Sequence, residues 1–274
     1  MKSSNLNNAL LYYLRQFPID KWKNKIEQFV HLPDEIVYFK NQQGISYHLE
    51  TNDHVMQQIY LRGIYEKNTL HHLIKLTNPS DTFVDVGANI GAYSLVMAQV
   101  LKMGKVISFE PNPMALKYLE KNIKMNKFSN ITIEKKGLSN KNHNATLYNP
   151  SLTTASLYKH QSSKNKETIQ LISLDSYCQK NNIENINILK IDIEGHELKC
   201  LEGANNIIEK SKKLILVMEI DTNCQNVGLK QNDLLNYMIK KKFKAYLPKA
   251  YPFKMKEINS IPKNYQDNVI FIKK

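Results

Sequence analysis

The segment from Asp81 to Gly91, which reads D-T-F-V-D-V-G-A-N-I-G, constrains the fold of this chain more than any other segment. Its apolar residues before the first glycine predict a buried strand, and residues 92–101 carry apolar side chains at helical spacing. The turn between them holds Gly87 and Gly91, and glycine tolerates a positive φ and the close approach of a ligand. A helix N-terminus adds unpaired backbone N–H groups. Strand, glycine turn and helix start therefore predict a small cradle for an anion or a ribose.

The spacing of the glycines and of two nearby acids indicates which ligand the cradle takes. A dinucleotide-binding turn reads G-x-G-x-x-G, whereas this turn reads G-x-x-x-G with Asp85 two residues before the first glycine. A carboxylate there repels a pyrophosphate and suits a ligand with an ammonium group. Glu110 follows the next expected strand, 23 residues after Gly87, where nucleoside-binding folds have an acid for the ribose hydroxyls. Glu110 could instead simply start the next helix, but the three residues together favour S-adenosylmethionine over NAD.

Strand patterns alternate with helical patterns from about residue 54 onward, which predicts a mostly parallel, doubly wound α/β sheet. An insertion, 137–180, is less regular, and we expect its Ser-, Thr-, Lys- and Asn-rich part, 151–167, to be a mobile loop. The chain is thereby divided into an N-terminal extension, 1–53, and a main domain, 54–274. The expected strands are 82–86, 105–109, 131–135, 186–192, 214–219, 243–247 and 268–272, and the expected helices include 66–76, 92–101 and 197–210.

The N-terminal extension carries no chemical motif. Apolar spacing predicts a helix over 5–17, a short amphipathic stretch over 22–30 and a hairpin over 36–50 around Gly44. We expect the extension to pack on the main domain as a cap that helps to shape the substrate pocket or a dimer face.

A second group of charged residues follows the strand expected at 186–192. Lys190, Asp192 and Glu194 alternate, so all three project to one side if the strand persists that far. Unpaired charges are costly in a core, which favours a functional role at the ligand edge of the sheet. Alternatively, Lys190 and Asp192 pair internally while Glu194 caps the helix over 197–210. Asp192 and Glu194, with His196 nearby, would also suit a divalent metal such as Mg²⁺, Mn²⁺ or Ca²⁺, which we keep as a secondary interpretation.

The net charge of +13 raises the question of nucleic-acid binding, because basic surfaces attract phosphate backbones. Ten lysines fall between Lys240 and Lys274, but the chain has only two arginines, Arg15 and Arg62. Readers of bases and phosphates depend on the arginine fork, so a solubilising lysine surface is favoured and nucleic acid stays an alternative partner. The same surface would suit anionic glycans, nucleotide-sugars or the headgroups of an anionic membrane.

Several features favour a cytoplasmic protein. The longest apolar runs, such as 214–218, are far shorter than the ~20 residues that span a bilayer. The first residues lack the apolar core of a secretory signal. Cys178, Cys200 and Cys224 are odd in number and form no C-x-x-C pair, which is typical of thiols in a reducing compartment. The sequence leaves the oligomeric state open.

Six motifs lie in register between residues 63 and 220. They are G-I-Y-E (63–66), F-V-D-V-G-A-N-I-G (83–91), F-E-P-N-P (109–113), G-L-S-N (137–140), L-K-I-D-I-E-G-H-E (189–197) and L-E-G-A (201–204). Together they resemble the FkbM family of S-adenosylmethionine-dependent methyltransferases, and the similarity ends at Glu219. One departure is Asn140, where the family usually has an Asp.

The resemblance implies a Rossmann-like methyltransferase fold with a seven-stranded sheet whose last strand is antiparallel. It also implies that Glu110 holds the ribose hydroxyls, that Tyr65 and Glu66 fold over the cofactor, and that Asp192 lies below the methyl donor. The cofactor-binding residues expected from the motifs are Tyr65, Glu66, Asp85, Gly87, Ala88, Asn89, Gly91, Glu110, Pro111 and Asp192.

Members of this family methylate hydroxyl groups, commonly on sugars and polyketide-type products, so the resemblance implies an O-methyltransferase acting on a glycan or small molecule. A hydroxyl must lose its proton as the methyl is transferred. We therefore expect Asp192 or Glu194 to be the general base and Lys190 to stabilise the developing alkoxide. The alternatives are a nucleic-acid methyltransferase that uses the basic surface and a non-catalytic binder of an adenosine ligand. A dehydrogenase is disfavoured because the G-x-G-x-x-G turn is missing.

Overall fold

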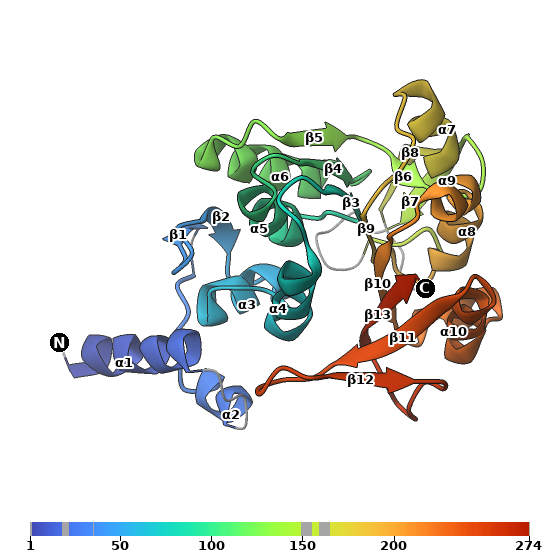
Figure 1. Ribbon diagram of the computed structural model, residues 1–274. Helices are drawn as coiled ribbons and strands as arrows, with labels where there is room; N and C mark the ends of the chain where they lie inside the picture. The colour runs from blue at the N-terminus through green and yellow to red at the C-terminus, as the bar shows by residue number, and fades with distance from the viewer. Residues whose placement is uncertain (1, 18–21, 35, 149–154, 159–164, 274) are drawn as a thin grey trace.

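The computed structural model describes residues 2–17, 22–34, 36–148, 155–158 and 165–273. An eight-stranded sheet in the order β12-β11-β13-β10-β9-β3-β4-β5 forms its centre (Figure 1). The strands β5, β4, β3, β9 and β10 are mutually parallel, and β13 runs antiparallel between β10 and β11. Their bounds are β3 (Thr82–Val86), β4 (Lys105–Phe109), β5 (Ile131–Glu134), β9 (Ile188–Ile191), β10 (Ile215–Ile220), β11 (Phe243–Pro248), β12 (Met255–Ile258) and β13 (Asp267–Lys273).

This sheet confirms the predicted Rossmann-like class and the antiparallel last strand. The sequence missed one strand, β12, which adds an eighth to the expected seven. β12 has four residues, two of them charged, and forms the outer edge by pairing with β11. Such a short polar edge strand lacks the apolar run by which the inner strands were predicted.

Alternating side chains of the strands enter two apolar cores, one on each face of the sheet. In β3, Phe83 enters one core while Val84 and Val86 enter the other, because successive side chains of a strand point to opposite faces. The first core contains residues of α3 (His54–Arg62), α4 (Lys67–Leu76) and α5 (Ala92–Val100). The second contains residues of α7 (Leu174–Lys180), α8 (Glu197–Glu202), α9 (Asn205–Lys210) and α10 (Gln231–Lys240).

The helix expected over 197–210 is divided in two, α8 and α9. Gly203 lies between them, and a Cβ atom there would come within 2.0 Å of the carbonyl oxygen of Ser139. The end of α8 therefore lies directly against the G-L-S-N motif, and only a residue without a side chain fits at position 203.

The N-terminal extension packs on the main domain through two sets of contacts. Helices α1 (Lys2–Gln16) and α2 (Lys23–Glu27) share a small apolar core with Leu61 of α3. The hairpin of β1 (Ile36–Lys40) and β2 (Ser46–Glu50) lies along α6 (Pro113–Asn126), whose Asn122 and Asn126 amides bond the backbone of β2. The predicted hairpin is confirmed, and the domain boundary at residue 53 stays a prediction.

The insertion is more regular than expected. It holds a small sheet of β6 (Gly137–Leu138), β8 (Lys166–Ile172) and β7 (His143–Tyr148). Strand β8 begins at Lys166, so the last two positions of the expected loop, 166–167, belong to a strand. Further along β8, buried Ile169 and Leu171 alternate with exposed residues. Residues 151–154 and 159–164 of that loop lie outside the described residues. In the described part of the chain, no helix combines the length and apolar character needed to cross a membrane.

Candidate active site

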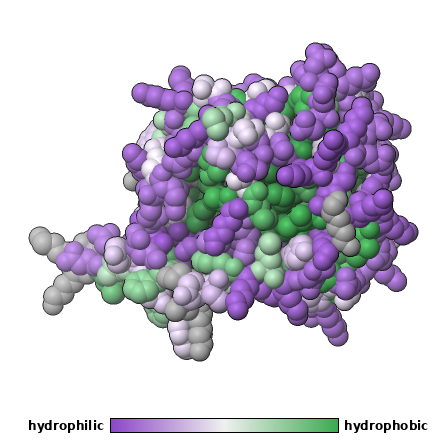
Figure 2. Space-filling view, in the orientation of Figure 1, coloured by the Kyte–Doolittle hydropathy of each residue, from purple (hydrophilic) through white to green (hydrophobic). Residues whose placement is uncertain are grey.

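A cavity of about 390 Å³ opens at the carboxyl ends of the parallel strands, where the glycine turn and the charged motif meet. Figure 2 shows apolar side chains exposed in a hollow of this face, bordered by polar ones. The cavity has an acidic end and an apolar end. Its acidic end is lined by Glu110, Asp192, Glu194 and Glu219, and its apolar end by Leu138, Leu147, Ala155, Leu157, Ile169 and Leu171.

The glycine turn is a rigid support for the cavity. Gly87 has a φ of 75°, and a Cβ atom there would lie 2.0 Å from the carbonyl oxygen of Asp192, so only glycine fits. The amides of Gly87 and Ala88 both donate to Phe109 O, at 3.0 and 3.1 Å, and the amide of Gly91 donates to Ala88 O. These three amides are therefore paired within the protein. They join β3 to β4 and order the turn itself.

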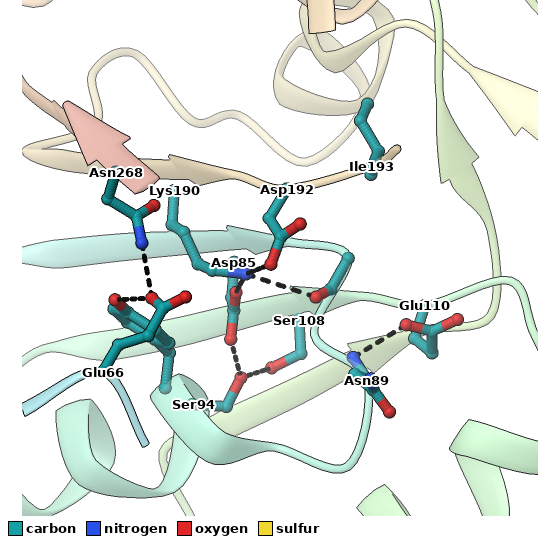
Figure 3. A network of polar contacts seen from close by, with 12 residues as sticks. Glu66, Asp85, Asn89, Ser94, Ser108, Glu110, Lys190, Asp192, Ile193 and Asn268 are labelled. Atoms are coloured by element: carbon teal, nitrogen blue, oxygen red, sulfur yellow. Dashed lines mark hydrogen bonds and ion pairs between the residues drawn. The ribbon is translucent and has the colours of Figure 1, made fainter. Parts of the chain in front are cut away.

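Glu110 lies where its spacing predicted, at the end of β4 and in the cavity wall. Its Oε2 accepts from Asn89 N at 2.7 Å (Figure 3). Its Oε1 accepts from Asn112 N at 2.8 Å. Burial raises the pKa of Glu110 to about 7, against these two hydrogen bonds, which lower it. Each carboxylate oxygen keeps a second lone pair for a ligand hydroxyl. Gly87, Asn89 and Pro111 also line the cavity.

Lys190 is the centre of a buried charge network (Figure 3). Its Nζ lies 3.1 Å from Asp192 Oδ2, 3.7 Å from Asp85 Oδ1 and 5.1 Å from the centroid of the Tyr93 ring. Asp85 also accepts a 2.6 Å hydrogen bond from Ser94 Oγ. Burial alone would lower the pKa of Lys190, but Asp192 and Asp85 outweigh it and raise the pKa, so the lysine is charged.

This network bears on two predicted roles. Lys190 is 3% exposed and Asp85 is fully buried, and neither is among the described residues that line the cavity. The roles predicted for Lys190 at a developing alkoxide and for Asp85 at a ligand's ammonium group therefore stay predictions. The alternative of an internal Lys190–Asp192 pair is the arrangement observed. The sequence missed this because alternation along one strand does not reveal how deep each side chain lies.

Three acids form the acidic wall, which we define as Asp192, Glu194 and Glu219. Strand β9 ends at Ile191, and Glu194 lies in a turn with a φ of 55°, so the strand does not persist to Glu194 as the predicted alternation required. The turn nevertheless brings Glu194 into the cavity. Glu197, at the start of α8, orders this turn, because its Oε1 accepts from Ile193 N and Gly195 N.

The acids of this wall differ in their affinity for protons. The charge of Asp192, with burial, raises the pKa of Glu219 to about 10, and the two carboxyls are hydrogen-bonded. Burial, followed by the charges of Asp192 and Asp221, raises the pKa of Glu194 to about 7. Asn223 Nδ2 donates to Glu194 Oε2 at 2.6 Å and orients it. At neutral pH Glu219 therefore holds a proton, while Glu194 is poised to take one.

Tyr65 and Glu66 both line a second cavity of about 420 Å³. Tyr65 and His54 line both cavities, whereas Glu66 lines the second. Glu66 Oε2 accepts from Tyr93 Oη at 2.5 Å and from Asn268 Nδ2 at 2.6 Å. Burial raises the pKa of Glu66 to about 7. The second cavity is lined mainly by polar groups, among them Lys23, Asn24, Glu27, Gln58, Arg62, Lys67, Asn68 and Asp267.

Among the titratable residues described as lining the cavity, the sequence missed Glu219 and His54. Glu219 ends β10, beside β9, and the pairing of Met218 with Ile191 puts the next residues, Glu219 and Asp192, side by side. The sequence signal that could have revealed Glu219 is an acidic residue at the end of an otherwise apolar strand. His54 begins α3 outside the motifs, and no pattern in the sequence indicated it.

Comparison with known proteins identifies the family. The model of the methyltransferase FkbM domain matches residues 85–245, more than half of the chain, from the glycine turn through the acidic wall. The chain belongs to the FkbM methyltransferase family.

Two relatives of this FkbM chain are methyltransferases by name. Hexuronic acid methyltransferase AglP of Haloferax volcanii is 28% identical over 167 residues, which cover 61% of this chain and 67% of AglP. Methyltransferase sdnD of Sordaria araneosa is 29% identical over 186 residues, 56% of this chain and 72% of sdnD. The crystal structure of methyltransferase FkbM from Methylobacillus flagellatus KT matches the fold with a TM-score of 0.50 at 17% identity, over 97% of this chain and 59% of that one.

A metal site is not supported by the described part of this FkbM chain. No group of three or more His, Cys, Asp or Glu side chains among the described residues has the arrangement of a metal site. His196, expected near Asp192 and Glu194, instead lies 3.0 Å from Ser139 Oγ and 2.8 Å from Tyr158 Oη.

Proposed function

We propose that this protein is an S-adenosylmethionine-dependent O-methyltransferase that acts on a hydroxyl group of a sugar, a glycan or a related small molecule. One observation carries the proposal: a single cavity joins Glu110 and the acidic wall to an apolar chamber at the ligand edge of the sheet. Membership of the FkbM family supports methyl transfer. The acceptor class rests on the family resemblance and on AglP, whose name makes it a hexuronic acid methyltransferase.

The two ends of the cavity fit the two ends of S-adenosylmethionine. Carboxylates at one end suit the ammonium and sulfonium charges of the ligand, and apolar side chains at the other suit the flat adenine. Glu110, in the same cavity wall, has oxygen lone pairs for the ribose hydroxyls. When bound, the cofactor supplies an activated methyl group.

The chain's own part in the reaction is to align the acceptor oxygen and to take its proton. Alignment of reacting atoms at ~3–3.5 Å supplies much of the rate in such transfers. We assign proton removal to Glu194, because it lines the cavity and its pKa of about 7 suits a base at neutral pH. The proton passes from the acceptor oxygen to the Glu194 carboxylate as the new oxygen–carbon bond forms and the sulfur–carbon bond breaks. Lys190 keeps Asp192 in place beside it.

The second cavity is the side from which we expect the acceptor to enter. It adjoins the acidic wall at Tyr65 and His54, which line both cavities. Its amides and charged groups, such as Asn24, Gln58 and Asp267, are the side chains that bond sugar hydroxyls. A polyhydroxylated acceptor therefore suits it better than an apolar one.

Binding of S-adenosylmethionine, measured by titration calorimetry, tests the proposal. We expect micromolar affinity for the wild-type protein and loss of binding in Glu110→Ala. Glu120→Ala is the matched control, because Glu120 lies on α6, is half-exposed and pairs with Lys135. Circular dichroism confirms that each variant is folded. A folded wild-type protein that does not bind the cofactor would refute the proposed function.

A further inference from the structure

We propose that Tyr158 and His196 are positioning residues that hold one wall of the cavity, residues 155–157, closed on the cofactor. The inference rests on the proposed function and adds residues to it. Ala155, Ser156 and Leu157 line the cavity at its apolar end, beside Leu147 and Leu171. They belong to the insertion, outside the six motifs, so contacts with other segments must hold this wall in place.

Two attachments fix residues 155–158. The first is to the small sheet: the backbones of Ser156 and Tyr148 exchange hydrogen bonds of 2.8 and 3.0 Å. The second is to the turn between β9 and α8: Tyr158 Oη lies 2.8 Å from His196 Nδ1 and 3.5 Å from Gly195 O. The wall is therefore held from both sides, and the Tyr158 hydroxyl makes the bond on the side of the acidic wall.

The surroundings of the His196 ring favour its hydrogen bond with Tyr158. It is 5% exposed, and its Nε2 lies 3.0 Å from Ser139 Oγ, so both ring nitrogens have hydroxyl partners. Burial, with Lys199 and His143 as smaller causes, lowers the pKa of His196 to about 4, so the ring is neutral at physiological pH. A neutral imidazole has one donor and one acceptor nitrogen, which matches two hydroxyl groups.

The position of His196 connects the wall to the chemistry. It follows Glu194 by two residues, in the same turn that brings Glu194 into the cavity. Ser139 belongs to the loop after Leu138, which lines the apolar end. The relay Tyr158–His196–Ser139 thus joins three segments that surround one ligand, and its loss should let the ligand leave faster.

The test compares wild type with Tyr158→Phe, which removes one hydroxyl and keeps the ring. Bound tritiated S-adenosylmethionine is chased with excess S-adenosylhomocysteine to give the dissociation rate constant. We expect this constant to rise about 3- to 10-fold, as the loss of one hydrogen bond implies, with little change in the association rate constant or in the Tm of the free protein. Tyr251→Phe is the control, because Tyr251 is 56% exposed on another surface.

A second variant separates positioning from general packing. Ser139→Ala should raise the dissociation rate constant alone, and combining it with Tyr158→Phe should add less than the two single effects together. An unchanged dissociation rate in Tyr158→Phe would refute the positioning role while leaving the proposed function intact. A fall in Tm of the free protein without a change in that rate would also refute it. A folded wild-type protein without any binding would refute both.

Discussion

Replacing Lys190 with methionine tests whether this lysine is part of the buried framework or of the catalytic chemistry. Methionine has a similar length and no charge, so the main loss is the cation that neutralises Asp85 and Asp192, 3.7 and 3.1 Å away. Breaking a buried ion pair by removing one partner costs about 3–5 kcal/mol, because the remaining charge is buried without compensation. Asp85 is fully buried and bears most of this cost, whereas the side chain of Asp192 is 25% exposed and bears less.

We therefore expect Lys190→Met to lower the free energy of unfolding by about 3 kcal/mol at pH 8, measured by urea denaturation. Burial already raises the pKa of Asp85 above its usual value, and loss of the cation raises it further. An acid whose pKa is raised on folding loses stability as the pH rises through that pKa. The deficit should therefore shrink toward pH 5.5, by at most about 1.4 kcal/mol per pH unit.

The double variant Lys190→Met/Asp85→Asn is the control. Asparagine keeps an acceptor for Ser94 Oγ, so removing both charges should recover more than half of the loss. A stable Lys190→Met protein that has lost turnover would refute the framework role and restore the catalytic one. A double variant no more stable than the single one would show that the Lys190–Asp85 pair is not the source of the loss.

Two further predictions concern the acidic wall and the glycine turn. Glu194→Gln should lower turnover about 100-fold or more while cofactor affinity stays near that of the wild type. The turnover of the wild-type enzyme should rise with pH through about 7, because Glu194 must be ionised to accept a proton. Loss of cofactor binding in Glu194→Gln would remove Glu194 from the catalytic role. Gly87→Ala should abolish cofactor binding and destabilise the fold by well over the ~1–2 kcal/mol of a left-handed alanine, because its Cβ would lie 2.0 Å from Asp192 O. Gly228→Ala, with nearly the same φ of 76° and open space around its Cβ, isolates the backbone cost in the same denaturation experiment; equal losses in the two variants would contradict the clash.

The sequence predicted local structure well wherever a periodic pattern was strong. The bounds expected for β3 and β4 agree with the structure, because their apolar runs end at a turn residue that is visible in the sequence. It failed at β12 and at the small sheet of the insertion. There the strands are short or polar, and partners far along the chain decide that they form.

By itself, the sequence determined the fold class, the glycine turn and the identity of most acids at the site, because these depend on local spacing and on residue type. The tertiary structure decided which of those acids face a ligand. It buried Lys190 and Asp85 beneath the cavity, brought Glu219 beside Asp192 and joined Tyr158 to His196. A side chain's exposure and its pKa depend on its depth in the fold, on strand pairing and on contacts between distant segments. The spacing of residues along one segment does not reveal any of these.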